Sequence, residues 1–110
     1  MRNKPIIWAR SSYQRLCRFP LEARQEAGFQ LRRVQSGEEP YDWKPVPTIG
    51  PGAMEIRIHD PQEYRVIYVA SFPDAIYVLH AFQKKSSKTA SRDIQLAREA
   101  YAEIRRQRKN

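Results

Sequence analysis

Two apolar runs in the second half of the chain set the strongest limit on the fold. Residues Tyr64–Phe72 and Ala75–Gln83 are rich in β-branched and aromatic side chains, and only Pro73 and Asp74 separate them. Runs of this length and composition, bounded by a turn, are typical of β-strands. Neither run alternates regularly with polar residues, so both faces of each strand should be buried. The sequence therefore predicts two central strands of an antiparallel meander.

A third strand precedes this pair. Met54, Ile56 and Ile58 alternate with Glu55, Arg57 and His59, which is the period of a half-buried strand, and residues 60–63 form the turn that follows. At the other end of the chain, residues 5–9 form a short apolar run that begins with a proline. Because proline cannot donate to a strand ladder, we expect this run to be an edge strand.

Three helices are predicted around these strands. A capping-box spacing at residues 11–14 starts the first, and a second runs from Phe19-Pro20 to about Val34, with Gly37 as its stop. Gly28 lies inside the second helix, where it costs roughly 1 kcal/mol relative to alanine, so we expect close packing against its backbone. The third helix shows one apolar face in its last twenty residues, formed by Ile94, Ala97, Tyr101 and Ile104.

Residues 36–52 connect the second helix to the strands. Four prolines and three glycines fall in this segment, which excludes a helix or a central strand. A long loop inside a small domain is often functional. Tyr41, Asp42, Trp43 and Lys44 lie within it, and both a partner-binding role and an inert connection remain open.

The order of these elements gives an α+β fold: strand, helix, helix, three strands, helix. Its 110 residues are the length of one domain, so we expect a single unit over residues 1–110. No apolar segment is long enough to span a membrane, and the first residues do not form a secretion signal, which makes the cytoplasm the expected compartment.

The chain is strongly basic, with 20 Lys and Arg residues against 12 Asp and Glu residues and a net charge of +8. Nine basic and three acidic residues lie between Lys84 and Asn110, so six of these eight charges fall in the last quarter. A polarised charge of this kind indicates an anionic partner: nucleic acid, an acidic protein or an anionic membrane surface.

Several kinds of site have no signature in the sequence. The four glycines do not have the spacing of a phosphate-binding loop, and the two histidines have no Cys or His–Glu partners at metal-ligand spacing. We therefore expect neither a metal nor a cofactor. The single cysteine, Cys17, lies on a predicted helix and fits a partly buried thiol better than a nucleophile.

The remaining chemistry lies in the cations. Arg57 and Arg65 should lie close together across a hairpin, Lys84, Lys85 and Lys88 follow the last strand, and Lys44 lies in the preceding loop. Cations that converge on one surface could bind a phosphodiester and stabilise the charge of its transition state. An ordinary solvated strand face with lysines at its rim is the alternative.

Two further groups bear on the type of ligand. Tyr41, Trp43 and Phe82 lie near these cations in the sequence, and aromatic rings stack on the bases of single-stranded RNA. Core packing is the alternative, especially for Phe82. His80 could transfer protons because its ordinary pKa lies near neutrality, but a hydrogen-bonded core histidine explains it equally well.

The segments Asp42–Pro45, Glu55–Ile58, Tyr64–Val66 and above all His80–Thr89 resemble the phage-related, HigB-like branch of the RelE/ParE toxin superfamily of type II toxin–antitoxin systems. The resemblance spans nearly the whole chain. It implies two N-terminal helices packed on an antiparallel sheet, with a helix after the last strand.

The resemblance also implies an activity: a metal-independent, ribosome-dependent endoribonuclease that cuts messenger RNA and inhibits translation. Arg57, Arg65, Lys84 and His80 are then the candidate catalytic residues, and Tyr41, Trp43, Lys44, Lys85 and Lys88 the candidate RNA-binding residues. A helix-turn-helix, HigA-like antitoxin is the implied partner. The superfamily also contains toxins that poison DNA gyrase without cutting RNA. A toxin of that kind and a basic RNA-binding adaptor remain the alternatives.

Overall fold

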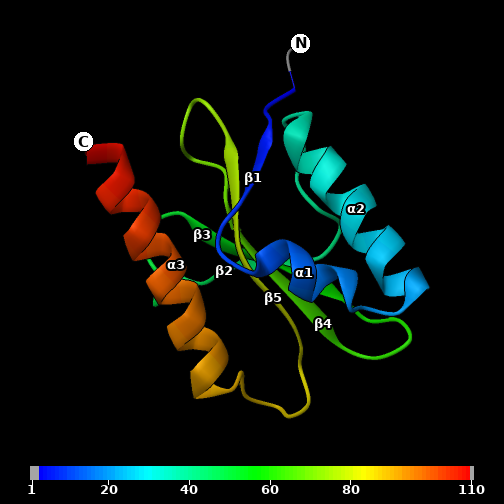
Figure 1. Cartoon of the computed structure of the whole chain (residues 1–110). Helices are drawn as coiled ribbons and strands as arrows, with labels where there is room; N and C mark the ends of the chain where they lie inside the picture. The colour runs from blue at the N-terminus through cyan, green and yellow to red at the C-terminus, as the bar shows by residue number, and fades with distance from the viewer. Residues whose placement is uncertain (1–2, 110) are drawn as a thin grey trace.

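The computed structural model describes residues 3–109, which form a five-stranded sheet with helices on both faces (Figure 1). In chain order the elements are β1 (Ile6–Trp8), α1 (Ser12–Cys17), α2 (Leu21–Gln35), β2 (Trp43–Pro45), β3 (Ala53–Ile58), β4 (Tyr64–Val69), β5 (Ile76–Gln83) and α3 (Ser91–Lys109). The predicted α+β class is confirmed, and its order holds with one added strand, β2. No helix within residues 3–109 combines the length and hydropathy that crossing a bilayer requires.

The sheet has the strand order β1-β5-β4-β3-β2. β4 and β5 lie inside it and are almost entirely buried, as their two-sided apolar pattern predicts. β1 is an edge strand, as expected, and it pairs in parallel with β5 while the other pairs are antiparallel. β4 ends at Val69 rather than Phe72, and beyond it the Lys4 ammonium donates hydrogen bonds to the carbonyl oxygens of Ala70 and Phe72.

Each face of the sheet has its own apolar core. α1 and α2 cover one face, where Leu16, Ala27 and Leu31 pack against Ile56 and Val66. α3 covers the other face with the apolar stripe that its sequence predicts (Figure 1); Ala97, Tyr101 and Ile104 are all buried there. Strand positions therefore divide cleanly between an α1/α2 face and an α3 face.

The segment 36–52 is not wholly irregular. β2 lies inside it and pairs with β3 at the edge of the sheet. An edge strand tolerates Pro45 because its missing N–H costs no ladder bond there. The prediction that prolines exclude a central strand holds, while the prediction of one continuous loop is wrong.

The helix ends and the helical glycine give mixed outcomes. α2 ends at Gln35 and Gly37 adopts a φ of 88°, so the predicted glycine stop is confirmed. The capping box is wrong, because the Ser11 hydroxyl accepts a hydrogen bond from Arg15 Nε instead of from the backbone. Close packing at Gly28 is also wrong: the nearest atom to an added Cβ is Arg32 Nη1, 3.8 Å away.

Candidate nucleic-acid interface

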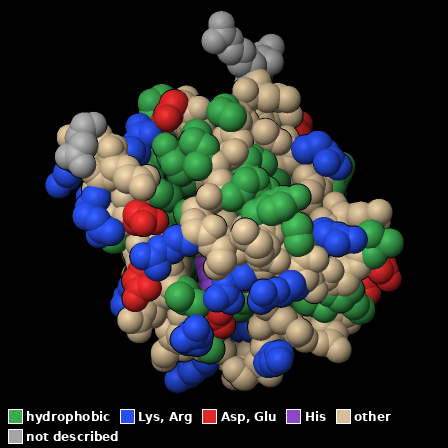
Figure 2. Space-filling model, in the orientation of Figure 1, with side chains coloured by type: hydrophobic (Ala, Val, Ile, Leu, Met, Phe, Trp, Pro, Cys, Tyr) green, Lys and Arg blue, Asp and Glu red, His purple; other side chains and the backbone are tan. Residues whose placement is uncertain are grey.

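A groove of about 590 Å³ opens where β5 ends. Its cations come from two parts of the chain: Lys84, Lys85 and Lys88 follow β5, while Arg15 and Arg18 belong to α1. Figure 2 shows Lys and Arg side chains gathered over the lower part of this face, the region where Figure 1 places α1 and the β5–α3 connection. We call this feature the basic groove. Its lining also includes Phe82, which is 8% exposed, and one carboxylate, Asp93.

The sequence indicated three of these five cations. Arg15 and Arg18 were missed, because no local pattern connects α1 with a segment some seventy residues away. The parallel pairing of β1 with β5 makes that connection: α1 follows β1 directly and so packs on β5. Assigning β1 and β5 as strands does not show that they are neighbours, so the sequence could not place α1 beside the end of β5.

Arg57 and Arg65 stand directly opposite each other in the β3–β4 ladder, so their predicted proximity is confirmed. The solvated strand face offered as the alternative for this pair is wrong for Arg65, which is 3% exposed. Its Nη2 lies 3.0 Å from Glu63 Oε1, and its Nε lies 3.6 Å from Glu55 Oε1. Arg57 is half-buried and its Nε has no hydrogen-bond partner among the described residues. Of the two, Arg57 retains the more available charge.

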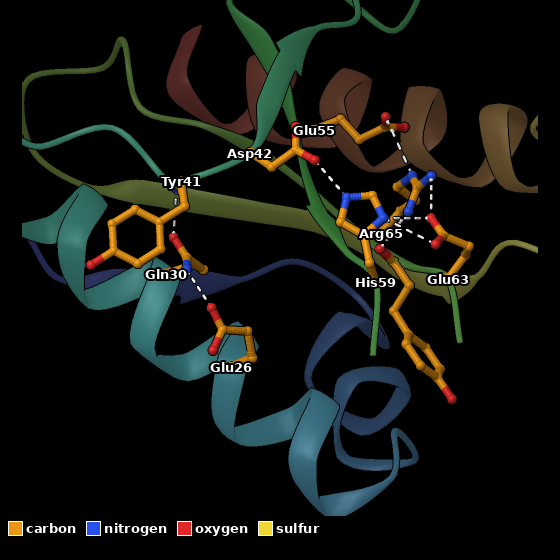
Figure 3. A network of polar contacts seen from close by, with 9 residues as sticks. Glu26, Gln30, Tyr41, Asp42, Glu55, His59, Glu63 and Arg65 are labelled. Atoms are coloured by element: carbon orange, nitrogen blue, oxygen red, sulfur yellow. Dashed lines mark hydrogen bonds and ion pairs between the residues drawn. The ribbon is translucent and has the colours of Figure 1, made fainter. Parts of the chain in front are cut away.

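The contacts of Arg65 continue into a chain of alternating charges. Figure 3 shows it running from Glu55 through Arg65 and Glu63 to His59 and Asp42. Hydrogen bonding to Asp42, and then to Glu63, raises the pKa of His59. The bonds from His59 and Arg65 lower the pKa of Glu63. The β3–β4 turn is therefore held by an ion network, which sequence spacing did not indicate.

His80 lies on the α3 face of β5 and is 2% exposed. Its Nε2 is 2.8 Å from Asp93 Oδ1, and its ring stacks on Phe82. Burial lowers the pKa of His80, while the bond to Asp93 opposes that shift. The hydrogen-bonded core histidine is the alternative that this geometry matches, and Asp93 links the ring to the basic groove.

The three candidate RNA-binding residues in or near β2 point to different sides of the sheet, because successive strand residues face opposite sides. Lys44 lies opposite Glu55 in the ladder, on the α3 face, whereas Trp43 lies opposite Ile56 on the α1/α2 face. Tyr41 is 68% exposed and packs between Phe29 and the Arg33 guanidinium, beside α2. Tyr41 and Trp43 are therefore not brought to the basic groove, although Phe82 is.

A five-stranded mixed sheet, two N-terminal helices on one face and a C-terminal helix on the other are compatible with the RelE-like toxin fold. The model of the phage-derived Gp49-like family (DUF891) matches residues 14–102, and the chain belongs to that family. The Gp49-like family is related to the RelE/HigB-like toxins of toxin–antitoxin systems. A search of curated proteins gave no match.

Proposed function

We propose that this protein is the toxin of a type II toxin–antitoxin pair and that it cuts messenger RNA bound to the ribosome. The basic groove is the observation that carries this proposal. Five cations around one concave surface suit a phosphodiester backbone. Phe82 lines the groove but is 8% exposed and belongs to the core on the α3 face, as the core-packing alternative predicted. Membership of the Gp49-like family supports the toxin class.

The reaction in this proposal needs no metal. The 2′-oxygen of the RNA attacks the adjacent phosphorus and loses its proton to a base, while the 5′-oxygen leaves with a proton from an acid. A 2′,3′-cyclic phosphate and a 5′-hydroxyl result. The protein must then supply positive charge around the phosphate and two proton-transfer groups.

The roles proposed for individual residues follow from their exposure. Lys84 is half-buried in the groove and supplies charge to the scissile phosphate, while Lys85 and Lys88 hold the flanking backbone. Arg57 is half-buried but lines a separate pocket beside Tyr41 and His59, so it acts outside the basic groove. Arg65 has a structural role in this proposal: its ion pairs with Glu55 and Glu63 hold the β3–β4 hairpin in place. His80 acts through Asp93, whose side chain is 21% exposed at the groove, because His80 itself is buried.

The test is cleavage of a ribosome-bound messenger, read out by mapping new RNA ends. We expect cleavage by the wild type and a loss of at least a hundredfold in the Lys84→Ala/Lys85→Ala variant, since one transition-state donor contributes a factor of roughly 10² to 10³. Arg106→Ala/Lys109→Ala removes the same charge from the exposed end of α3 and should cleave like the wild type.

Three outcomes would contradict the nuclease proposal. Binding of RNA without new ends would favour the adaptor, and inhibition of DNA gyrase without RNA binding would favour the gyrase poison. Cleavage that depends on a titrated metal would contradict the metal-independent chemistry. A slow reaction on free RNA with excess protein, with and without chelator, avoids the magnesium that ribosomes need.

We also propose a helix-turn-helix antitoxin as the partner, bound on the α1/α2 face rather than in the basic groove. Leu21 and Phe29 of α2 are exposed on that side and offer apolar anchors, which tight interfaces use more than exposed lysines. Association should then depend little on salt. A steep fall in the association rate with added salt would place the antitoxin over the cations instead.

A further inference from the structure

A second, smaller cavity lies under α3. It measures about 180 Å³ and is lined by strands β2 to β5, the segment after β2 and the start of α3. Pockets for drug-sized ligands are about 300–1,000 Å³. This cavity therefore suits a single ring system rather than a whole nucleotide, and five of its ten lining residues are polar or charged.

The cavity borders the basic groove. Phe82 and Asp93 belong to the walls of both. A polynucleotide whose phosphates lie against Lys84 and Lys85 would thus have a base beside the cavity entrance. Phe82 at the junction is 8% exposed and its ring stacks on His80, so it forms an apolar wall for the base rather than an open stacking platform.

The polar groups of the cavity have a defined chemistry. Glu55 is 3% exposed and lines it, and Arg65 is its one ion-pair partner among the described residues. Figure 3 shows that contact. A carboxylate has about four lone-pair sites, so acceptor capacity remains for a ligand. Lys44, directly opposite Glu55 in the ladder, adds an amine donor to the same wall.

We propose that this cavity binds a guanine base of the RNA and so sets the sequence preference of the protein. The inference rests on the proposed function, in which the basic groove holds RNA. Guanine presents N1–H and N2–H₂ side by side, which matches a carboxylate, and O6 next to them, which matches an amine. Adenine places an amino group where guanine has O6, and uracil has one N–H between two carbonyls.

The physical reason for selectivity is burial. Arg65 already compensates part of the Glu55 charge, and guanine N–H groups would fill the acceptor sites that remain. A base that presents a carbonyl there would lose its hydration without a partner, so a site built to accept N–H groups rejects bases that lack them. A good bidentate pair to a base discriminates by about 1–3 kcal/mol, which is roughly fivefold to 150-fold in affinity.

The test measures binding of the four nucleoside 5′-monophosphates by isothermal titration calorimetry. All four carry the same phosphate, so the basic groove contributes equally. We expect guanosine monophosphate to bind about tenfold more tightly than the other three. Glu55→Gln should remove that preference, because an amide presents one acceptor and one donor in place of two acceptors.

A filling variant tests the cavity without touching a charge. Ile94→Phe places a larger side chain in the wall and should abolish the guanine preference while RNA binding to the groove persists. Leu96→Phe, an equal change two residues along the same helix and outside the cavity wall, should keep the preference. If Glu55→Gln fails to fold, the comparison of Ile94→Phe with Leu96→Phe still tests whether the cavity sets the guanine preference.

Equal affinity for the four nucleotides, or a preference for another base, would overturn the proposal. So would an unchanged preference in Ile94→Phe. Failure of the nuclease proposal is a separate result. A guanine preference without any cleavage of ribosome-bound messenger would support the base-binding cavity and contradict the nuclease activity.

Discussion

At the scale of single residues, the candidate site is governed by which charges are already paired. Arg57 and Arg65 face each other across one hairpin and look equivalent in the sequence. Arg65 is buried between two carboxylates, whereas the Arg57 guanidinium makes no ion pair with a carboxylate in the described part of the chain. One arginine therefore supports the sheet and the other is available to a ligand.

This difference predicts unequal costs of substitution. Arg65→Met should lower the free energy of unfolding by about 3–5 kcal/mol, because it leaves buried Glu55 without its partner. Arg57→Met should stay within roughly 1 kcal/mol of the wild type. Urea unfolding of both variants measures the difference, and equal costs would show that the Glu55–Arg65 pair contributes little.

The two histidines predict opposite dependences on pH. Hydrogen bonds to Asp42 and Glu63 raise the pKa of His59, so its stabilisation is present below the unfolded value near 6.5 and is lost as pH rises through the folded value. Burial lowers the pKa of His80, so its neutral form favours the fold at higher pH, and stability falls as pH drops below about 6.5.

Unfolding measured at about pH 5.5 and pH 8 separates these effects. His59→Gln should cost more at the lower pH, and His80→Gln should cost more at the higher pH. The same pH trend in both variants would contradict the assigned environments.

At the scale of elements, two glycines that look alike in the sequence have different surroundings. A Cβ at Gly50 would lie 2.5 Å from the ring of Tyr101, which is 4% exposed and donates a hydrogen bond to the carbonyl of Pro51. Gly50 thus allows the segment after β2 to approach α3. Gly28 has only a flexible arginine near it and lies in the middle of α2.

Alanine at these positions should therefore act in opposite directions. Gly50→Ala should destabilise the protein by about 1–3 kcal/mol through overpacking against Tyr101. Gly28→Ala should stabilise it by about 0.5–1 kcal/mol, since alanine restricts the unfolded chain and favours the helix. Thermal and urea unfolding report both, and a stabilising Gly50→Ala would mean that Tyr101 can move away.

At the scale of the whole molecule, the basic groove exists because two distant segments meet. α1 brings Arg15 and Arg18 to the end of β5, where the three lysines lie. Residues of α1 and of the segment after β5 therefore form one surface, and the binding of RNA should depend on both segments.

This arrangement predicts a change in salt dependence. For single strands the logarithm of the binding constant falls with the logarithm of salt concentration at about 0.7 per phosphate neutralised, so Arg15→Ala/Arg18→Ala should reduce the slope by roughly 1.4. Arg106→Ala/Lys109→Ala should leave it unchanged. Fluorescence anisotropy with a short single-stranded RNA measures both slopes, and equal effects would indicate a diffuse positive field instead of a groove.

Local patterns in the sequence determined most of the elements. The two-sided apolar runs predicted β4 and β5, the alternation over residues 54–59 predicted β3, and the helical stripes predicted α2 and α3. These signals are reliable because burial acts on neighbours at fixed spacing, 2 or 3.6 residues, which a linear chain displays directly. The pairing of Arg57 with Arg65 followed from the same rule.

Only the tertiary structure decided how those elements combine into a site. The parallel pairing of β1, the arginines that α1 adds to the groove and the cavity beside Glu55 all join residues far apart in the chain. Such contacts depend on packing through space and leave no periodic trace. The sequence by itself determined a basic α+β toxin-like chain, and the fold decided which of its charges are paired and which face a ligand, because pairing requires proximity that spacing does not encode.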